Sequence, residues 1–198
     1  MGRQHRKPAK VKRKSARQNK PRIKAAGRRR KAAKRTRKLR WSPTPEAQKV
    51  IDATRDVFDN TPGAKSDCNR FVKAVCKKVL TDPFAPDATA DVITNNIRDP
   101  GWRTANGWTG LEQDPVWAKN SADRGDLVIG GATSSDLGEG YGHVVVVVSC
   151  ERLWRGFGYA SWGKFRGIGR VNEKMTRAYK YRDLPKVSYM CKGAPSPS

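Results

Sequence analysis

The sequence predicts an α+β domain, with N-terminal helices packed on an antiparallel sheet, behind a disordered basic arm. Apolar residues recur at helical spacing in the stretch 66–80, which carries a cysteine in its first turn. The stretch 143–149 is dominated by valine and follows a glycine-rich turn, which is typical of a buried strand. Residues 1–40 contain twenty Lys or Arg and no Asp or Glu. Such a segment cannot bury enough apolar surface to offset its ordering entropy.

The disordered basic arm is expected to comprise residues 1–41, and residues 42–198 are expected to form one domain. The arm supplies twenty of the formal +24 charges. It is therefore expected to contact polyanions such as nucleic acid, lipopolysaccharide or teichoic acid, or to dock on a partner during delivery. No apolar run suits a cleaved signal peptide, and none is long enough to span a bilayer. We expect no transmembrane segment and no export through the usual cleaved signal.

Periodicity and turn residues predict the order of elements within the domain. Helices are expected at 45–58, 66–80 and 87–98. Strands are expected at 123–130, 143–149, 157–161 and 187–191. A long irregular region between the third helix and the first strand contains Trp102, Trp108 and Trp117. These rings either pack in the core or form the wall of a substrate groove.

Cys68 is a candidate nucleophile because of its place in the helix 66–80. With Ser66 as the N-cap, Cys68 is the second helical residue. Free backbone N–H groups and the positive end of the helix dipole stabilise a thiolate there and lower the thiol pKa. The alternative interpretation is that Cys68 is a small buried hydrophobe on the apolar stripe.

His143 is the candidate base, because it is the one histidine that follows the basic arm. It stands where the glycine-rich turn enters the valine strand, so a rigid element would hold its imidazole. A histidine at this position can take the proton from a cysteine at a helix start and later protonate a leaving amine. A structural histidine with satisfied hydrogen bonds is the alternative.

Four short motifs make residues 45–191 resemble the papain-like cell-wall peptidases of the NlpC type, the CHAP amidases and the type VI secretion amidase effectors. The motifs are DCNRFV at 67–72, GDLVI at 125–129, GHV at 142–144 and YASWG at 159–163. Asn69 and Arg70 replace the Ser-Gly pair that is common in this family. No acidic, histidine or glutamine residue stands clearly at the third catalytic position, so Ser161 or a backbone carbonyl is expected to orient the imidazole.

The resemblance implies a papain-like fold and hydrolysis of amide bonds in the peptides of peptidoglycan. Cys68 would attack the carbonyl carbon, and His143 would act as base and then as acid. Asp67, Asn69, Tyr141 and Trp162 are the expected substrate contacts. The resemblance also implies an effector that is cytoplasmic before delivery, passes through a secretion machinery without a cleaved signal peptide, and acts in the periplasm or cell wall. An immunity partner would accompany it.

Other interpretations remain open at this stage. The domain could be an inactive relative whose basic arm binds nucleic acid or another polyanion, or it could be an acyltransferase or a protease that acts on proteins. No cofactor and no metal are expected, because the four cysteines form no CxxC pair. Cys76 is expected to be buried. Cys150 and Cys191 both end predicted strands, so a disulfide between them is compatible with the sequence.

Overall fold

The computed structural model describes residues 41–165 and 167–193, and the residues from Trp41 onward form one compact unit. The arm predicted at 1–41 lies outside the described residues, apart from Trp41. The helices are α1 (Pro45–Asn60), α2 (Cys68–Val79), α3 (Ala90–Arg98), α4 (Pro100–Ala105), α5 (Pro115–Arg124) and α6 (Ser134–Leu137). Three short 3-10 helices are η1 (Ala64–Ser66), η2 (Met175–Arg177) and η3 (Tyr181–Lys186). The strands are β1 (Thr109–Glu112), β2 (Leu127–Ala132), β3 (His143–Val148), β4 (Tyr159–Trp162), β5 (Arg170–Lys174) and β6 (Ser188–Lys192).

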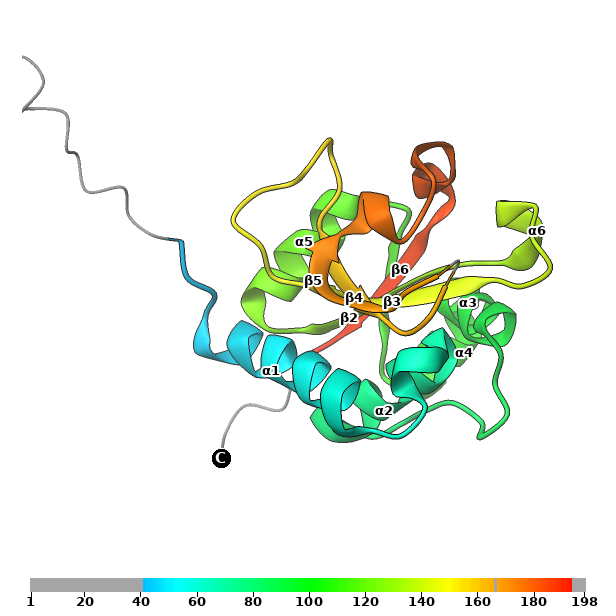
Figure 1. Ribbon diagram of the computed structural model, residues 1–198, viewed down its shortest axis with the longest axis horizontal. Coiled ribbons are helices and arrows are strands. Elements are labelled where there is room, and N and C mark those ends of the chain that lie inside the picture. The colour runs from blue at the N-terminus through cyan, green and yellow to red at the C-terminus, as the bar shows by residue number, and fades with distance from the viewer. Residues whose placement is uncertain (1–40, 166, 194–198) are drawn as a thin grey trace, which may run out of the picture. The chain divides into compact units, whose positions relative to one another are not determined.

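The six strands form one sheet in the order β1-β6-β2-β3-β4-β5, and every neighbouring pair is antiparallel (Figure 1). The predicted α+β class, with helices and an antiparallel sheet, is confirmed. β3 lies in the interior of the sheet between β2 and β4. Its first residue, His143, pairs with Ala132 of β2, whereas the pairing with β4 covers only the second half of β3. The start of β3 is therefore held by β2.

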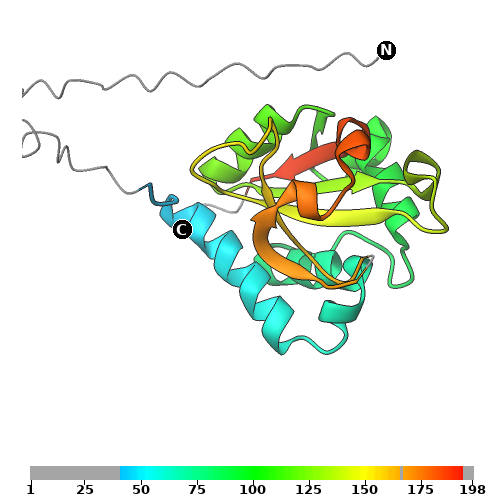
Figure 2. The ribbon, with the colours of Figure 1, turned by 45° about the horizontal axis from the view of Figure 1, so that its top comes forward.

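Helices cover both faces of the sheet (Figures 1 and 2). On one face α1, α2 and α3 bury the even-numbered valines of β3, which are Val144, Val146 and Val148. On the other face α5, η2 and η3 form a second core with Val145 and Val147. Because neither face meets solvent, β3 is apolar without alternation, a pattern more common in parallel sheets. Burial of each valine contributes roughly 1.5–3 kcal/mol.

The structure corrects three expectations about the elements. The region between the third helix and the first strand is not irregular, because it folds into α4, β1 and α5. Trp108 in this region is buried, whereas Trp117 is 60% exposed, so the three tryptophans do not share one role. The sequence also gave no sign of β5, an edge strand of mostly polar and charged residues.

The disulfide between Cys150 and Cys191 that the sequence allows does not form in this structure. The strands that end near these two cysteines are not neighbours in the sheet. β2 lies between β3 and β6, and both cysteines are free thiols.

Candidate functional site

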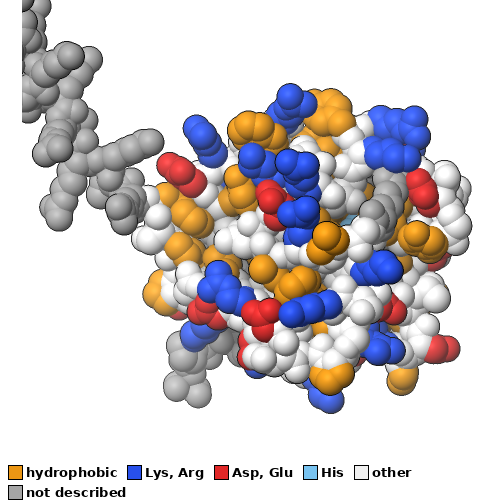
Figure 3. Space-filling model, viewed as in Figure 1, with side chains coloured by type: hydrophobic (Ala, Val, Ile, Leu, Met, Phe, Trp, Pro, Cys, Tyr) orange, Lys and Arg blue, Asp and Glu red, His pale blue; other side chains and the backbone are white. Residues whose placement is uncertain are grey.

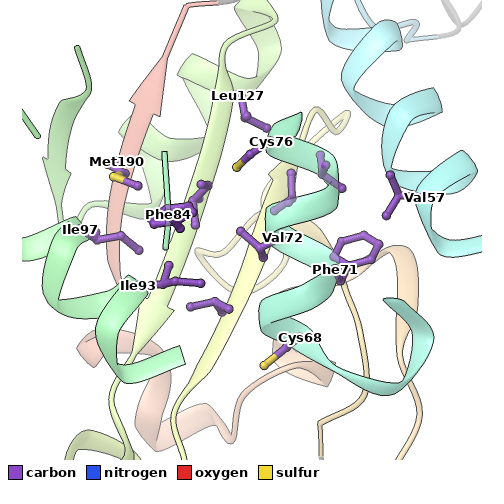
Figure 4. Close-up of a cluster of buried hydrophobic side chains, with 14 of the residues drawn as sticks. Val57, Cys68, Phe71, Val72, Cys76, Phe84, Ile93, Ile97, Leu127 and Met190 are labelled. Atoms are coloured by element: carbon purple, nitrogen blue, oxygen red, sulfur yellow. The ribbon is translucent and has the colours of Figure 1, made fainter. Parts of the chain in front are cut away.

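The N-terminal end of α2 places Cys68 against the sheet. Asp67 is the N-cap, since its Oδ1 accepts hydrogen bonds from the N–H groups of Asn69 at 2.7 Å and Arg70 at 3.1 Å. Ser66, the expected cap, instead ends η1. Cys68 is therefore the first residue of the helix and not the second. Figure 4 shows it at this end of α2, with Cys76 further along the helix.

Two glycines allow close backbone approaches around the end of α2 and the start of β3. A Cβ atom on Gly163, directly after β4, would lie 2.3 Å from the carbonyl oxygen of Asp67. A Cβ atom on Gly142, directly before His143, would lie 2.2 Å from Oδ1 of Asp91. Real Cβ atoms do not approach other atoms this closely, so a larger residue at either position would displace the segment that it faces.

The Cys68 side chain is 8% exposed, and its thiol donates a hydrogen bond to Asn69 Oδ1 at 3.4 Å. Burial raises the pKa of this thiol to about 11, although the N–H groups of Val144, Cys68 and Asn69 favour the thiolate. The expectation of a lowered pKa is therefore wrong for this structure. Loss of hydration around the thiolate outweighs the N–H groups at the helix end, so the thiol stays protonated at neutral pH.

His143 is fully buried in a group of aromatic rings. Its imidazole stacks on Phe165, with the ring centroids 3.9 Å apart and the planes 7° from parallel. The ring of Trp162 meets it edge-on at 6.4 Å, and the ring of Tyr179 lies 5.0 Å away. The Tyr179 hydroxyl donates a hydrogen bond of 2.9 Å to the carbonyl oxygen of His143. Packing on several sides therefore fixes the orientation of the imidazole.

Cys68 and His143 both lie near the start of β3, but they pack on different faces of the sheet. Cys68 packs in the core that contains Val144, whereas the rings around His143 belong to the opposite core. The N–H of Val144, which directly follows His143, stabilises the Cys68 thiolate. Burial, and to smaller extents Tyr189 and Cys68, raise the pKa of Tyr179, the ring that packs on His143. A direct contact between the Cys68 sulfur and the imidazole stays a prediction.

A pocket of about 510 Å³, here called the Cys68 pocket, opens beside this helix end. Four of the expected site residues line it, namely Asp67, Cys68, Asn69 and Tyr141. The remaining lining residues are Ser66, Thr89, Ala90, Asp91, Gly140, Gly142, Lys164 and Phe165. The side chain of Tyr141 is 57% exposed at the mouth and packs edge-on against Phe165. The pocket is large enough for a short peptide segment and has direct access to the wall that contains Cys68.

Ser161 and Trp162 do not have the roles expected from the sequence. Ser161 pairs with Val146 in the sheet register, and its hydroxyl donates to Thr54 Oγ1 at 3.2 Å. The same oxygen accepts from the N–H of Asn172 at 2.9 Å. Ser161 therefore joins α1 to β5 and does not orient the imidazole. Trp162 is 1% exposed and does not line the Cys68 pocket, and its ring packs edge-on against His143.

Asp91 is a site residue that sequence reasoning missed. Its carboxylate accepts hydrogen bonds from the N–H of Ser134 at 2.8 Å and from the hydroxyl of Ser134 at 2.5 Å. These bonds tie α3 to the segment that leads into His143, and the carboxylate forms part of the pocket wall. No local signal marks Asp91, because it looks like an ordinary acidic residue in the first turn of a helix.

Three further findings bear on the class of the protein. Among the described residues, no cluster of three or more His, Cys, Asp or Glu side chains could hold a metal ion. Within the same residues, no helix combines the length and apolar character needed to cross a membrane. No protein-family profile matches the sequence, and no curated protein matches it either. The resemblance to the cell-wall amidases rests on the four motifs alone.

Proposed function

We propose that this protein is a papain-like cysteine hydrolase of the NlpC or CHAP type that cleaves amide bonds in peptidoglycan peptides. The observation that carries the proposal is the position of the Cys68 thiol. Cys68 is the first residue of α2 and lines the Cys68 pocket. Its sulfur lies beside the N–H of Val144, the residue that follows His143. A thiol, an imidazole and a backbone N–H that can bind an oxyanion are the parts that acyl transfer needs.

The raised pKa of Cys68 determines how the first step proceeds. Because the resting thiol is protonated, His143 takes its proton as the sulfur attacks the substrate carbonyl carbon. The oxygen of the tetrahedral intermediate becomes negative, and the Cys68 N–H at the helix start donates to it. His143 then protonates the leaving amine, and the C–N bond breaks to give a thioester. Water, deprotonated by His143, hydrolyses the thioester and restores the thiol.

The biological setting that we propose follows from the same resemblance. The substrate is the peptide stem or cross-bridge of peptidoglycan, and the protein acts in the periplasm or cell wall after delivery without a cleaved signal peptide. A secretion machinery and an immunity protein would be its partners. The basic arm, for which polyanion binding is expected, lies outside the described residues.

Digestion of purified peptidoglycan tests the proposal directly. Full-length protein should release new amino groups and defined peptide fragments, which mass spectrometry identifies. Cys68→Ala should abolish this release, since it removes the nucleophile. Cys76→Ala is the matched control, because it makes the same change two turns along the same helix, at a fully buried position. Thermal melts of both variants show whether each stays folded.

His143 needs a more careful substitution, because alanine would leave a cavity in the aromatic group. His143→Phe keeps a ring that can stack on Phe165, and His143→Gln keeps a polar side chain of similar length. Both should abolish hydrolysis. Hydrolysis that survives Cys68→Ala, or that survives both changes at His143, would contradict the proposal. A wild-type protein that binds DNA but releases no fragment would favour the inactive, polyanion-binding alternative.

A further inference from the structure

A groove lined with positive charges borders β5, the edge strand of the sheet. Two adjoining hollows of about 490 and 290 Å³ share Thr176 and Arg177. The cationic groove, as we call it, is defined by Trp154, Arg155, Arg170, Lys174, Arg177, Lys180 and Tyr181. Among the described residues, no Asp or Glu lines either hollow. Figure 3 shows basic side chains mixed with hydrophobic ones over the region where β5 lies in Figure 1.

Most cations of the groove have no partner of opposite charge. Within the described part of the chain, Arg155, Arg170, Lys174 and Arg177 form no ion pair, and only Lys180 has one, with Glu139 at 3.2 Å. Several basic residues elsewhere on the domain do pair with acidic ones, as Lys78 does with Asp56 and Arg98 with Asp136. Unpaired like charges that crowd together repel one another, and a bound anion would relieve that repulsion.

The aromatic end of the groove is built on a rigid turn. Trp154 and Phe157 close the turn with two backbone hydrogen bonds of 2.7 and 3.1 Å. Arg155 at the tip has a φ of 51°, a left-handed conformation that costs a non-glycine residue free energy. The Lys174 ammonium lies 3.8 Å from the centre of the Trp154 ring, and the Arg155 guanidinium lies 5.9 Å from that of Tyr181. The rings and charges are thus ordered before any ligand arrives.

The cationic groove adjoins the Cys68 pocket at Phe165. Phe165 lines both the larger hollow of the groove and the Cys68 pocket, and its ring stacks on His143. A polymer with one amide bond at Cys68 would therefore pass over Phe165 and lie against Arg170 and Arg177. Binding of remote parts of a substrate is a general way to position the bond that reacts.

We propose that the cationic groove binds the carboxylate-bearing strand of the peptidoglycan whose amide bond enters the Cys68 pocket. This inference rests on the proposed function and extends it to the recognition of the polymer. Peptide stems carry free carboxylates, which Arg170 and Arg177 bind with paired N–H donors. The exposed parts of the Trp154 and Tyr181 rings provide apolar surface for the sugar rings of the strand.

Sedimentation with insoluble peptidoglycan tests the groove without catalysis. The full-length Cys68→Ala variant is compared with the same protein carrying Arg170→Gln and Arg177→Gln. The matched control carries Lys49→Gln and Arg55→Gln, which remove two exposed, unpaired charges from α1. Both variants keep the basic arm, so any binding by the arm is the same in the groove variant and in the control. The groove variant should bind roughly tenfold more weakly and the control within about twofold. Peptidoglycan with amidated carboxylates should remove the difference between them.

Kinetics of the active protein on soluble peptidoglycan fragments give the second readout. The groove substitutions should raise KM roughly tenfold and leave kcat within about twofold, because they lie away from the reacting atoms. Equal weakening in the groove and control variants would overturn the proposal. It would also fail if the groove variant lost binding to oligo(dT) while its binding to peptidoglycan was unchanged. If the groove substitutions selectively weaken binding but the wild-type protein cleaves nothing, the proposed binding role of the groove stands and the proposed hydrolase function is contradicted.

Discussion

Burial of the Cys68 thiol predicts slow alkylation at neutral pH. A pKa of about 11 leaves about one thiol in 10,000 ionised at pH 7, compared with about 3% for an unperturbed thiol with a pKa near 8.5. Only the thiolate reacts with iodoacetamide. Cys68 should therefore react about 300-fold more slowly than a cysteine in a short peptide, before any further slowing from its limited exposure.

The assay follows alkylation of each cysteine by mass spectrometry between pH 6 and pH 10. The Cys68 rate should rise about tenfold for each pH unit up to a pH near 11. Cys76 is fully buried, and burial raises its pKa further, so it should be the slowest cysteine. The fold must be monitored as well. Since folding raises the Cys68 pKa, this thiol favours the folded state below about pH 9 and loses that contribution as the pH rises through 11.

A Cys68 rate that is fast and nearly flat from pH 6 to pH 8 would refute this reasoning. It would mean that the free protein already holds a thiolate. His143→Gln separates two causes of such a result. Loss of the fast reaction in this variant would assign the thiolate to pairing with the imidazole. An unchanged rate would assign it to the N–H groups at the start of α2, as the sequence suggested.

Three further substitutions test how the site is built. Gly163→Ala should lower the free energy of unfolding by about 1–3 kcal/mol in urea titrations and reduce hydrolysis, because its Cβ would collide with the Asp67 carbonyl. Tyr179→Phe should cost about 1–3 kcal/mol by leaving the buried His143 carbonyl without this donor; an unchanged urea midpoint would contradict that role. Ser161→Ala should cost a similar amount because it breaks one buried and one partly buried hydrogen bond. The pH profile of hydrolysis should stay the same in this variant, whereas a shifted profile would restore Ser161 as a partner of the imidazole.

Local sequence was enough to predict the elements that carry the candidate pair. The expected helix 66–80 corresponds to α2, and the valine run corresponds to β3. α2 has apolar residues at helical spacing, and β3 is a run of β-branched residues that directly follows Gly142. Neither signal depends on distant residues. The motif around Cys68 also predicted a helix start, and the structure places four expected site residues in the lining of the pocket beside it.

The sequence by itself therefore determined the class of the fold and the position of Cys68 at a helix start. Only the tertiary structure decided how Cys68 is hydrated, because a thiol pKa depends on all the atoms that exclude water from it. The same holds for Ser161 and Trp162, since strand pairing and the packing of α1 set which face of the sheet each side chain meets. The cationic groove was equally hidden. Its residues are spread over 154–181, and β5 brings them together through pairing with β4 that no local pattern predicts.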